Sequence, residues 1–186
     1  MNVAILFGRK NSKSIKNKNI LKIFSKPMFM YPLDAAKKVN EIEKIYVSSD
    51  SSYILKQAKK KKCIPIKRPK YLCNDKALLE DAIQHAVNYC QNENNQKIKN
   101  FIILLCNSIC VKNEDIKKGL KILNNSKKFD TVTTVSKFNN FSPVRTKKII
   151  KNSLLNYIPN EKLKKFTPLS CDRDKSVHAY YCTQSF

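Results

Sequence analysis

The sequence predicts an α/β fold in which a mainly parallel sheet is covered by helices on both faces. Short apolar or β-branched runs recur along the chain, and segments with helical spacing separate them. One run, NFIILLC at 100–106, is almost continuously apolar, as expected for a central strand that is buried on both faces. Repeated strand, helix, strand units with right-handed crossovers give a layered sheet of parallel strands.

The first strand is predicted over the apolar run NVAILF at 2–7, which leads into a basic loop. The segment at 27–40 has helical spacing, and the β-branched run KIYVSSD at 44–50 predicts a strand that ends in a polar turn. Beyond Ser136 the pattern loosens, and we predict no topology for the rest of the chain. The elements expected in between are a helix at 52–62, a strand at 63–67, a helix at 76–92, the strand at 100–106, a helix at 113–126 and a strand at 130–136.

Length and composition set the general class of protein. A chain of 186 residues is long enough for a core of its own, so we expect one domain over 1–186. It contains no apolar run of the roughly 18 residues that a membrane-spanning helix needs, and its first apolar run is too short for a signal peptide. We therefore expect a soluble, cytoplasmic protein. The seven cysteines form no C-x-x-C pair, which favours buried free thiols over a zinc site.

The net charge of +23 suits a polyphosphate, a nucleic acid or an anionic membrane surface. However, the excess is mostly Lys and is spread along the whole chain, as a general compositional bias would spread it. The run KKKK at 59–62, for example, is expected to end a helix and face water. Aromatic residues do not alternate with the basic runs, and no nucleic-acid motif is present. We expect neither a nucleic acid nor a membrane as partner, although a nucleic-acid binder remains an alternative.

The basic loop FGRKNSKSIKNKNI at 7–20 is a candidate phosphate site. It leaves the carboxyl end of the first predicted strand, which is where ligands bind in sheets of this kind. The polar turns at 48–50 and 106–108 follow two more strands and are expected to converge on it. The loop has the glycines neither of a Walker A motif nor of a dinucleotide loop. Its side chains therefore have to make the contacts: a planar donor fork from Arg9, compact charges from Lys13 and Lys18, and neutral hydrogen bonds from Ser12 and Asn19.

The same loop resembles the signature of the acylneuraminate cytidylyltransferases, the CMP-sialic acid synthetase family. Arg9, Ser12, Lys13, Lys18 and Asn19 occur in the order and at the spacing of that signature. The resemblance implies a Rossmann-like, layered α/β/α nucleotidyltransferase fold with a mainly parallel sheet. Further segments that resemble the family, over nearly the whole chain, are VSSD at 47–50, KRPKYLCNDKAL at 67–78, ILLCNSICV at 103–111, TVSKFNNFSPVR at 134–145 and CDRD at 171–174.

This resemblance implies transfer of CMP from CTP to a sialic-acid-like 2-keto sugar acid, with release of pyrophosphate. It implies a Mg²⁺ ion on the phosphates and a homodimer, as is usual in the family. It leaves open which sugar acid is used: sialic, legionaminic, pseudaminic or another. The implied site residues are Arg9, Lys13 and Lys18 on the triphosphate, Ser12 and Asn19 assisting them, Arg68 and Asp75 near the nucleoside, Asn107 near the nucleotide or sugar, and Asp172 and Asp174 as candidate metal ligands.

The sequence also departs from the family pattern. Ser14 replaces a glycine, the CNSIC segment lacks a proline, and the acidic element that the family carries near its C-terminus is not visible. A truncated or degenerate relative that binds nucleotide without turnover is therefore the alternative. Two acidic residues also have structural interpretations: Asp50 is expected to be a helix N-cap before SSYIL, and Asp75 can equally cap the helix near Lys76.

Overall fold

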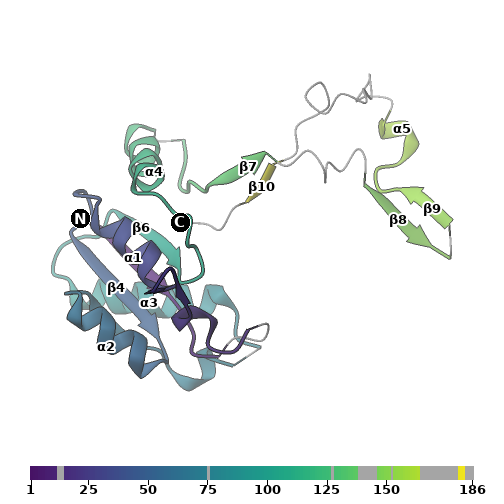
Figure 1. Cartoon of the computed structure of the whole chain (residues 1–186). Coiled ribbons are helices and arrows are strands. Elements are labelled where there is room, and N and C mark those ends of the chain that lie inside the picture. Colours follow the sequence, from purple (N-terminus) through teal and green to yellow (C-terminus); the bar gives the residue numbers. More distant parts are fainter. Residues whose placement is uncertain are drawn as a thin grey trace. The chain divides into compact units, whose positions relative to one another are not determined.

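The computed structural model describes residues 1–11, 15–74, 76–126, 128–137, 146–151, 153–163 and 180–182 (Figure 1). By its internal contacts the chain divides into two units, of which the first comprises Met1–Thr133 and the second Thr134–Thr183. Each unit is described by itself. These are contact units, and the single domain over 1–186 stays a prediction.

The first unit is built on a four-stranded parallel sheet (Figure 1). Its strands lie in the order β5 (Ile64–Lys67), β4 (Lys44–Ser49), β1 (Asn2–Phe7) and β6 (Asn100–Leu105). The chain therefore adds strands on one side of β1 and then crosses to its other side, which creates a switch point between β1 and β6. Phe7 pairs in register with Ser48 and Leu105, so the carboxyl ends of three strands lie side by side. The predicted α/β fold with a parallel sheet is confirmed.

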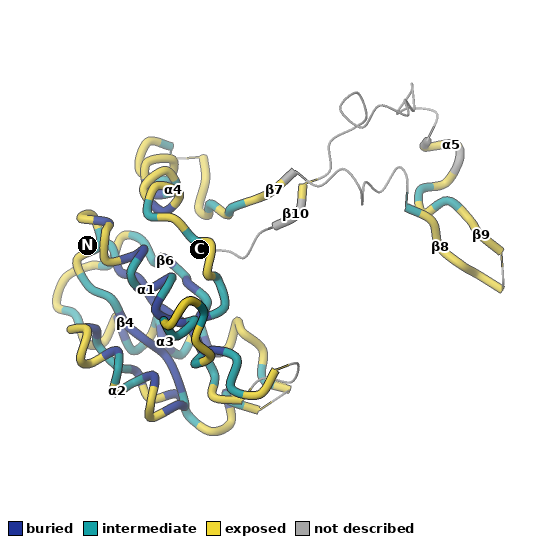
Figure 2. Tube along the Cα trace, viewed as in Figure 1, coloured by how far each residue is buried: buried dark blue, intermediate teal, exposed yellow. Residues whose placement is uncertain are grey.

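Helices cover both faces of this sheet because side chains alternate along its strands. On one face, Ala4 and Leu6 of β1 share a buried cluster with α1 (Met30–Lys37), α2 (Ser52–Lys60) and α4 (Asn113–Asn125). On the other face, side chains of β1, β4 and β5 pack against α3 (Leu79–Glu93). Figure 2 shows β4 largely buried while the outer surfaces of the helices are exposed. The residues of the α3 face are Val3, Ile5, Phe7, Tyr46, Ile66, Ala82, Ala86 and Cys90.

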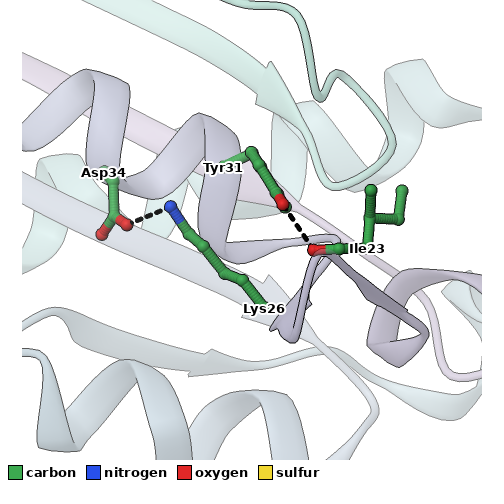
Figure 3. Close-up of polar contacts among 4 residues, drawn as sticks. All are labelled: Ile23, Lys26, Tyr31 and Asp34. Carbon is green, nitrogen blue, oxygen red and sulfur yellow. Dashed lines mark hydrogen bonds and ion pairs between the residues drawn. The ribbon is translucent and has the colours of Figure 1, made fainter.

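The helix predicted at 27–40 is shorter in the structure, because a small hairpin precedes it. Strands β2 (Lys22–Ile23) and β3 (Lys26–Pro27) pair antiparallel, and the helix begins only at Met30. Figure 3 shows how the hairpin is attached to α1: the Tyr31 hydroxyl donates to the Ile23 carbonyl at 2.5 Å, and Lys26 forms an ion pair with Asp34 at 2.5 Å.

The helix predicted at 76–92 begins at Leu79, three residues late. The Asn74 side-chain oxygen accepts from the backbone N–H groups of Lys76 (2.8 Å) and Ala77 (2.9 Å). Such a turn satisfies these donors outside a helix. The 3₁₀ helices η1 (Lys18–Ile20) and η2 (Lys70–Leu72) also lie in segments for which no helix was predicted.

The predicted bounds of the strand at 130–136 are wrong, because the strand in the structure begins only at Val135. Residues 131–134 have no regular structure, and the strand found there is β7 (Val135–Lys137) in the second unit. Its partner is β10 (Tyr180–Cys182), which pairs antiparallel across a long sequence separation that local patterning does not reveal. The second unit also holds an antiparallel hairpin of β8 (Lys147–Ile150) and β9 (Ser153–Asn156), followed by α5 (Asn160–Leu163). None of the helices in the described ranges is long and apolar enough to cross a membrane.

Candidate active site

A pocket of about 320 Å³ lies at the carboxyl ends of β1 and β6, next to the start of α3. This is the position of the switch point in the strand order, where parallel sheets bind their ligands. One wall is apolar and is formed by residues such as Leu72, Leu78 and Leu79. The charged lining residues in the described part are all cations, and no carboxylate of that part lines the pocket. The polar lining residues are Arg9, Lys18, Asn19, Arg68, Asn74 and Asn107.

Five residues predicted from the sequence therefore come together in one pocket, although they are up to 98 positions apart. They are Arg9, Lys18, Asn19, Arg68 and Asn107. Their roles toward a ligand stay predictions. The other predicted site residues, namely Ser12, Lys13, Asp75, Asp172 and Asp174, lie outside the described residues.

Gly8 is required where β1 leaves the sheet, because the chain passes very close to β6. A Cβ atom at position 8 would lie 2.2 Å from the Cys106 Sγ and 3.0 Å from its Cβ. The Cys106 side chain is buried, and burial raises the pKa of its thiol to about 12. Cys106 is thus a neutral packing group at physiological pH and not a nucleophile. Its contact with Gly8 holds the ends of β1 and β6 close together at the point where the basic loop begins.

The beginning of the basic loop is tied to β4 and to η1. The Gly8 N–H donates to the Ser48 carbonyl at 3.1 Å, which extends the strand pairing by one residue. Beyond it, the Asn19 side chain donates to the Arg9 carbonyl at 2.9 Å, and the Lys10 N–H donates to the Asp50 carboxylate at 2.6 Å.

The prediction that Asp50 caps the following helix is therefore wrong. The N-cap of α2 is Ser51, whose hydroxyl accepts from the Ile54 N–H at 3.4 Å. The Asp50 carboxylate instead accepts from the Lys10 N–H of the loop. From the sequence alone, the Asp50 carboxylate could accept either from the first N–H groups of α2 or from another segment. The structure shows that Lys10 lies close enough to be its partner.

Arg68 places a buried positive charge at the pocket. Its side chain is 7% exposed and lies over the Phe7 ring, with 5.8 Å between the guanidinium carbon and the ring centroid. It donates from Nε to the Ser48 hydroxyl at 3.3 Å and from Nη2 to the Ser48 carbonyl at 3.0 Å. Desolvation lowers the pKa of Arg68, yet a guanidinium remains protonated in proteins. These partners are neutral oxygens, so they leave its charge available to an anionic ligand.

Asn74 is a site residue that sequence reasoning missed. Its backbone carbonyl accepts from Arg9 Nη1 at 3.4 Å, and its side-chain amide donates to the Tyr71 carbonyl at 2.8 Å. Together with its bonds to the N–H groups of Lys76 and Ala77, these contacts hold Asn74 next to Arg9. The signal in the sequence is an Asn at the start of a turn, which is too common a pattern to indicate a ligand site.

The described residues do not by themselves form a magnesium site. Mg²⁺ is usually held by one or two carboxylates together with substrate phosphates and water. The described lining offers amide oxygens and cations, and no group of three or more His, Cys, Asp or Glu side chains able to hold a metal occurs among the described residues. The candidate ligands Asp172 and Asp174 lie outside these residues.

Comparison with known proteins agrees with this fold. The profile of the cytidylyltransferase family matches residues 3–167. Because the match covers most of the sequence, the chain belongs to the cytidylyltransferase family. Among solved structures, the fold resembles CMP:2-keto-3-deoxy-manno-octonic acid synthetase complexed with CTP (TM-score 0.65, 15% identity, 88% of this chain and 68% of that one). It also resembles 4-diphosphocytidyl-2C-methyl-D-erythritol synthase (TM-score 0.60, 10% identity, 85% and 68%).

Three curated relatives are similar in sequence. A Helicobacter pylori protein named pseudaminic acid cytidylyltransferase and UDP-2,4-diacetamido-2,4,6-trideoxy-β-L-altropyranose hydrolase is 33% identical over 77% of this chain and 27% of its own length. The N-acylneuraminate cytidylyltransferase of Escherichia coli is 26% identical over 85% of this chain and 40% of its own length. The pseudaminic acid cytidylyltransferase of Campylobacter jejuni is 30% identical over 69% and 56%. The match thus spans between about a quarter and somewhat over half of the length of these relatives.

Proposed function

We propose that this protein transfers CMP from CTP to a nine-carbon 2-keto sugar acid of the sialic or pseudaminic type, giving a CMP-sugar and pyrophosphate. The observation that carries the proposal is the pocket at the switch point, where Arg9, Lys18 and Arg68 converge and no described carboxylate lines the wall. A triphosphate is the nucleotide group that such a cluster of cations complements. Membership of the cytidylyltransferase family and the names of the three curated relatives support a cytidine nucleotide and a sugar acid.

The chemistry needs positioning and charge neutralisation more than covalent help. The anomeric hydroxyl oxygen forms a bond to the α-phosphorus, and the bond from this phosphorus to the bridging oxygen breaks. The electron pair leaves with pyrophosphate, and the hydroxyl proton passes to solvent. Negative charge develops on the leaving group, so we assign Arg9 and Lys18, with Lys13, to the triphosphate. Arg68 and Asn107 are assigned to the nucleotide from their places in the same pocket.

The test is pyrophosphate release from CTP with a panel of nine-carbon 2-keto sugar acids. We expect release to require both substrates and to fall about 100-fold or more in Arg9→Ala and in Lys18→Ala, the usual size of the effect when an electrostatic contact is removed. The matched control is Lys59→Ala, which removes a cation from the exposed surface of α2 and should retain wild-type rates. Equal rates in all three variants would remove the basic loop from the mechanism.

A nucleotide-binding protein without turnover is the second candidate. It is favoured by Ser14, which stands where the family signature has a glycine. The same assay separates the two candidates. Saturable CTP binding by folded protein, with no pyrophosphate released for any acid in the panel, would support the second candidate and contradict the first.

We also propose that the reaction requires Mg²⁺.

We further propose that the protein is a homodimer. Support comes from the β8–β9 hairpin, whose apolar residues are largely exposed to solvent in the single chain, for example Ile149 (75% exposed) and Leu154 (68% exposed). These residues oppose each other directly across the hairpin. Exposed apolar surface of this kind is often covered in an oligomer. Light scattering of the wild type and of a Leu154→Lys variant tests this: the wild type should be twice the chain mass and the variant should dissociate.

A further inference from the structure

The peptide unit between Arg9 and Lys10 is held by side chains on both of its polar groups. Its carbonyl, which belongs to Arg9, accepts from the Asn19 amide at 2.9 Å. Its N–H, which belongs to Lys10, donates to the Asp50 carboxylate at 2.6 Å. Because the peptide group is planar, bonds on opposite ends fix the orientation of the whole plane. Rotation of this plane would break both bonds together.

Both anchors are themselves fixed. Asn19 is 8% exposed, and its backbone carbonyl accepts from the Phe29 N–H at 3.1 Å. Asp50 directly follows β4, the strand that pairs with β1 as far as Phe7. The loop is thus held at the point where strand pairing ends. Arg9, whose side chain lines the pocket, is the residue immediately before the held peptide group.

The carboxylate of Asp50 needs an explanation in this location. A negative charge beside a site for a polyphosphate opposes binding of the ligand. Asp50 also acts electrostatically on Arg68, since its charge is among the influences that raise the pKa of that guanidinium. The hydrogen bond from the Lys10 N–H explains why an acceptor stands at position 50, and this explanation does not require contact with the ligand.

We propose that Asp50 and Asn19 are positioning residues that lock the Arg9–Lys10 peptide plane, so that Arg9 is held at the pocket before a nucleotide binds. This inference rests on the proposed function for its kinetic consequence. In this proposal Asn19 acts by holding the Arg9 carbonyl, whereas the sequence suggested a direct contact with phosphate. The proposal also requires the acceptor oxygen of residue 50 but not its negative charge.

The first test does not depend on activity. Amide hydrogen exchange at Lys10, followed by NMR, should be protected in the wild type and at least about tenfold faster in Asp50→Ala, since the hydrogen bond of that amide is lost. Asp50→Asn keeps an acceptor oxygen and should stay protected. Asn19→Ala, which releases the other end of the plane, should also accelerate this exchange. Asp115→Ala, an exposed carboxylate on α4, is the control and should change nothing.

The second test is kinetic. We expect Asp50→Ala to lower kcat/KM for CTP about 10- to 100-fold, as a misplaced contact group does. Asp50→Asn should keep kcat near the wild type and have an equal or lower KM for CTP, because a repulsive charge is removed. An Asp50→Asn variant as impaired as Asp50→Ala, with the Lys10 amide still protected, would show that the charge itself acts and would overturn the inference. An unprotected Lys10 amide in the wild type would overturn it too. Absence of turnover in the wild type would count against the proposed function only.

Discussion

Gly8 and Cys106 approach so closely that no side chain can be accommodated at position 8. The 2.2 Å separation between an added Cβ and the Cys106 Sγ is far below any normal contact. This contact joins the ends of β1 and β6, the two strands between which the pocket lies. Because Gly8 directly precedes Arg9, a change in this contact would also shift the start of the basic loop.

Gly8→Ala should therefore destabilise the protein by about 1–3 kcal/mol, the usual cost of overpacking a core. Gly119→Ala is the matched control, because its Cβ would lie in ordinary contact, 3.8 Å from the Val132 side chain. Gly119 lies within α4, where Ala is favoured over Gly by roughly 0.5–1 kcal/mol. Urea unfolding measures both. Equal stability of Gly8→Ala and the wild type would show that the two strands are further apart than described.

The turn between β2 and β3 should be improvable by mutation. Phe24 and Ser25 both have positive φ, 47° and 65°, and the Phe24 side chain is 95% exposed. Two consecutive positive φ values are typical of a type I′ turn, for which Asn-Gly is preferred. We expect Ser25→Gly to stabilise the fold by about 0.4–1 kcal/mol.

Ser25→Ala is the control, because Ala carries a Cβ atom and therefore lacks the freedom of Gly at positive φ. It should not stabilise the protein. Thermal unfolding of the two variants decides the matter, and a stabilised Ser25→Ala would contradict the turn geometry.

The buried thiols predict a loss of stability at high pH. Burial raises the pKa of Cys106 and of Cys90 from 9.0 to about 12 in the folded protein. In the unfolded chain these thiols lose their protons near pH 9, while the folded protein keeps them. Their contribution to stability is complete below pH 9 and is lost as the pH rises from 9 toward 12. The free energy of unfolding should therefore fall over this range, and less steeply in Cys90→Ala. A slope unchanged by that substitution would argue against the raised pKa.

Accessibility to alkylation gives an independent measurement on the same residues. Cys90 and Cys106 are buried, whereas Cys110 is exposed. Brief treatment of the native protein with iodoacetamide near pH 8 should modify Cys110 and leave the two buried thiols intact. Peptide mass mapping reads the result. Rapid modification of Cys106 would mean that the Gly8 contact opens readily.

Chelation tests the proposed magnesium requirement. EDTA should abolish pyrophosphate release, and added Mg²⁺ should restore it. The melting temperature without nucleotide should not change, because Mg²⁺ is usually held in part by the substrate phosphates. A shift in melting temperature on chelation would indicate a metal that the protein holds by itself.

Much of the fold could be predicted from the sequence because its signals are local. The apolar run at 2–7, the β-branched run at 44–50 and the apolar run at 100–106 correspond closely to β1, β4 and β6. Three residues of the basic loop, Arg9, Lys18 and Asn19, were also placed at the correct end of the sheet, since parallel strands end at the same edge.

The remaining features depend on contacts between distant residues. Asp50 was predicted to cap a helix, and only the approach of Lys10 gives its carboxylate a different partner. The pairing of β7 with β10 likewise has no signal in either segment alone. Asn74 contributes through its backbone carbonyl, which every residue possesses, so its residue type could not reveal that contact.

The most direct test of the proposed CMP transfer is identification of its product. Wild-type protein, CTP, Mg²⁺ and a nine-carbon 2-keto sugar acid would be followed by ³¹P NMR. We expect a new phosphodiester signal from a CMP-sugar that grows in equal amount with pyrophosphate, and neither signal without the acid. Persistence of the CTP signals with every acid tested, despite demonstrated CTP binding, would contradict the proposed transfer.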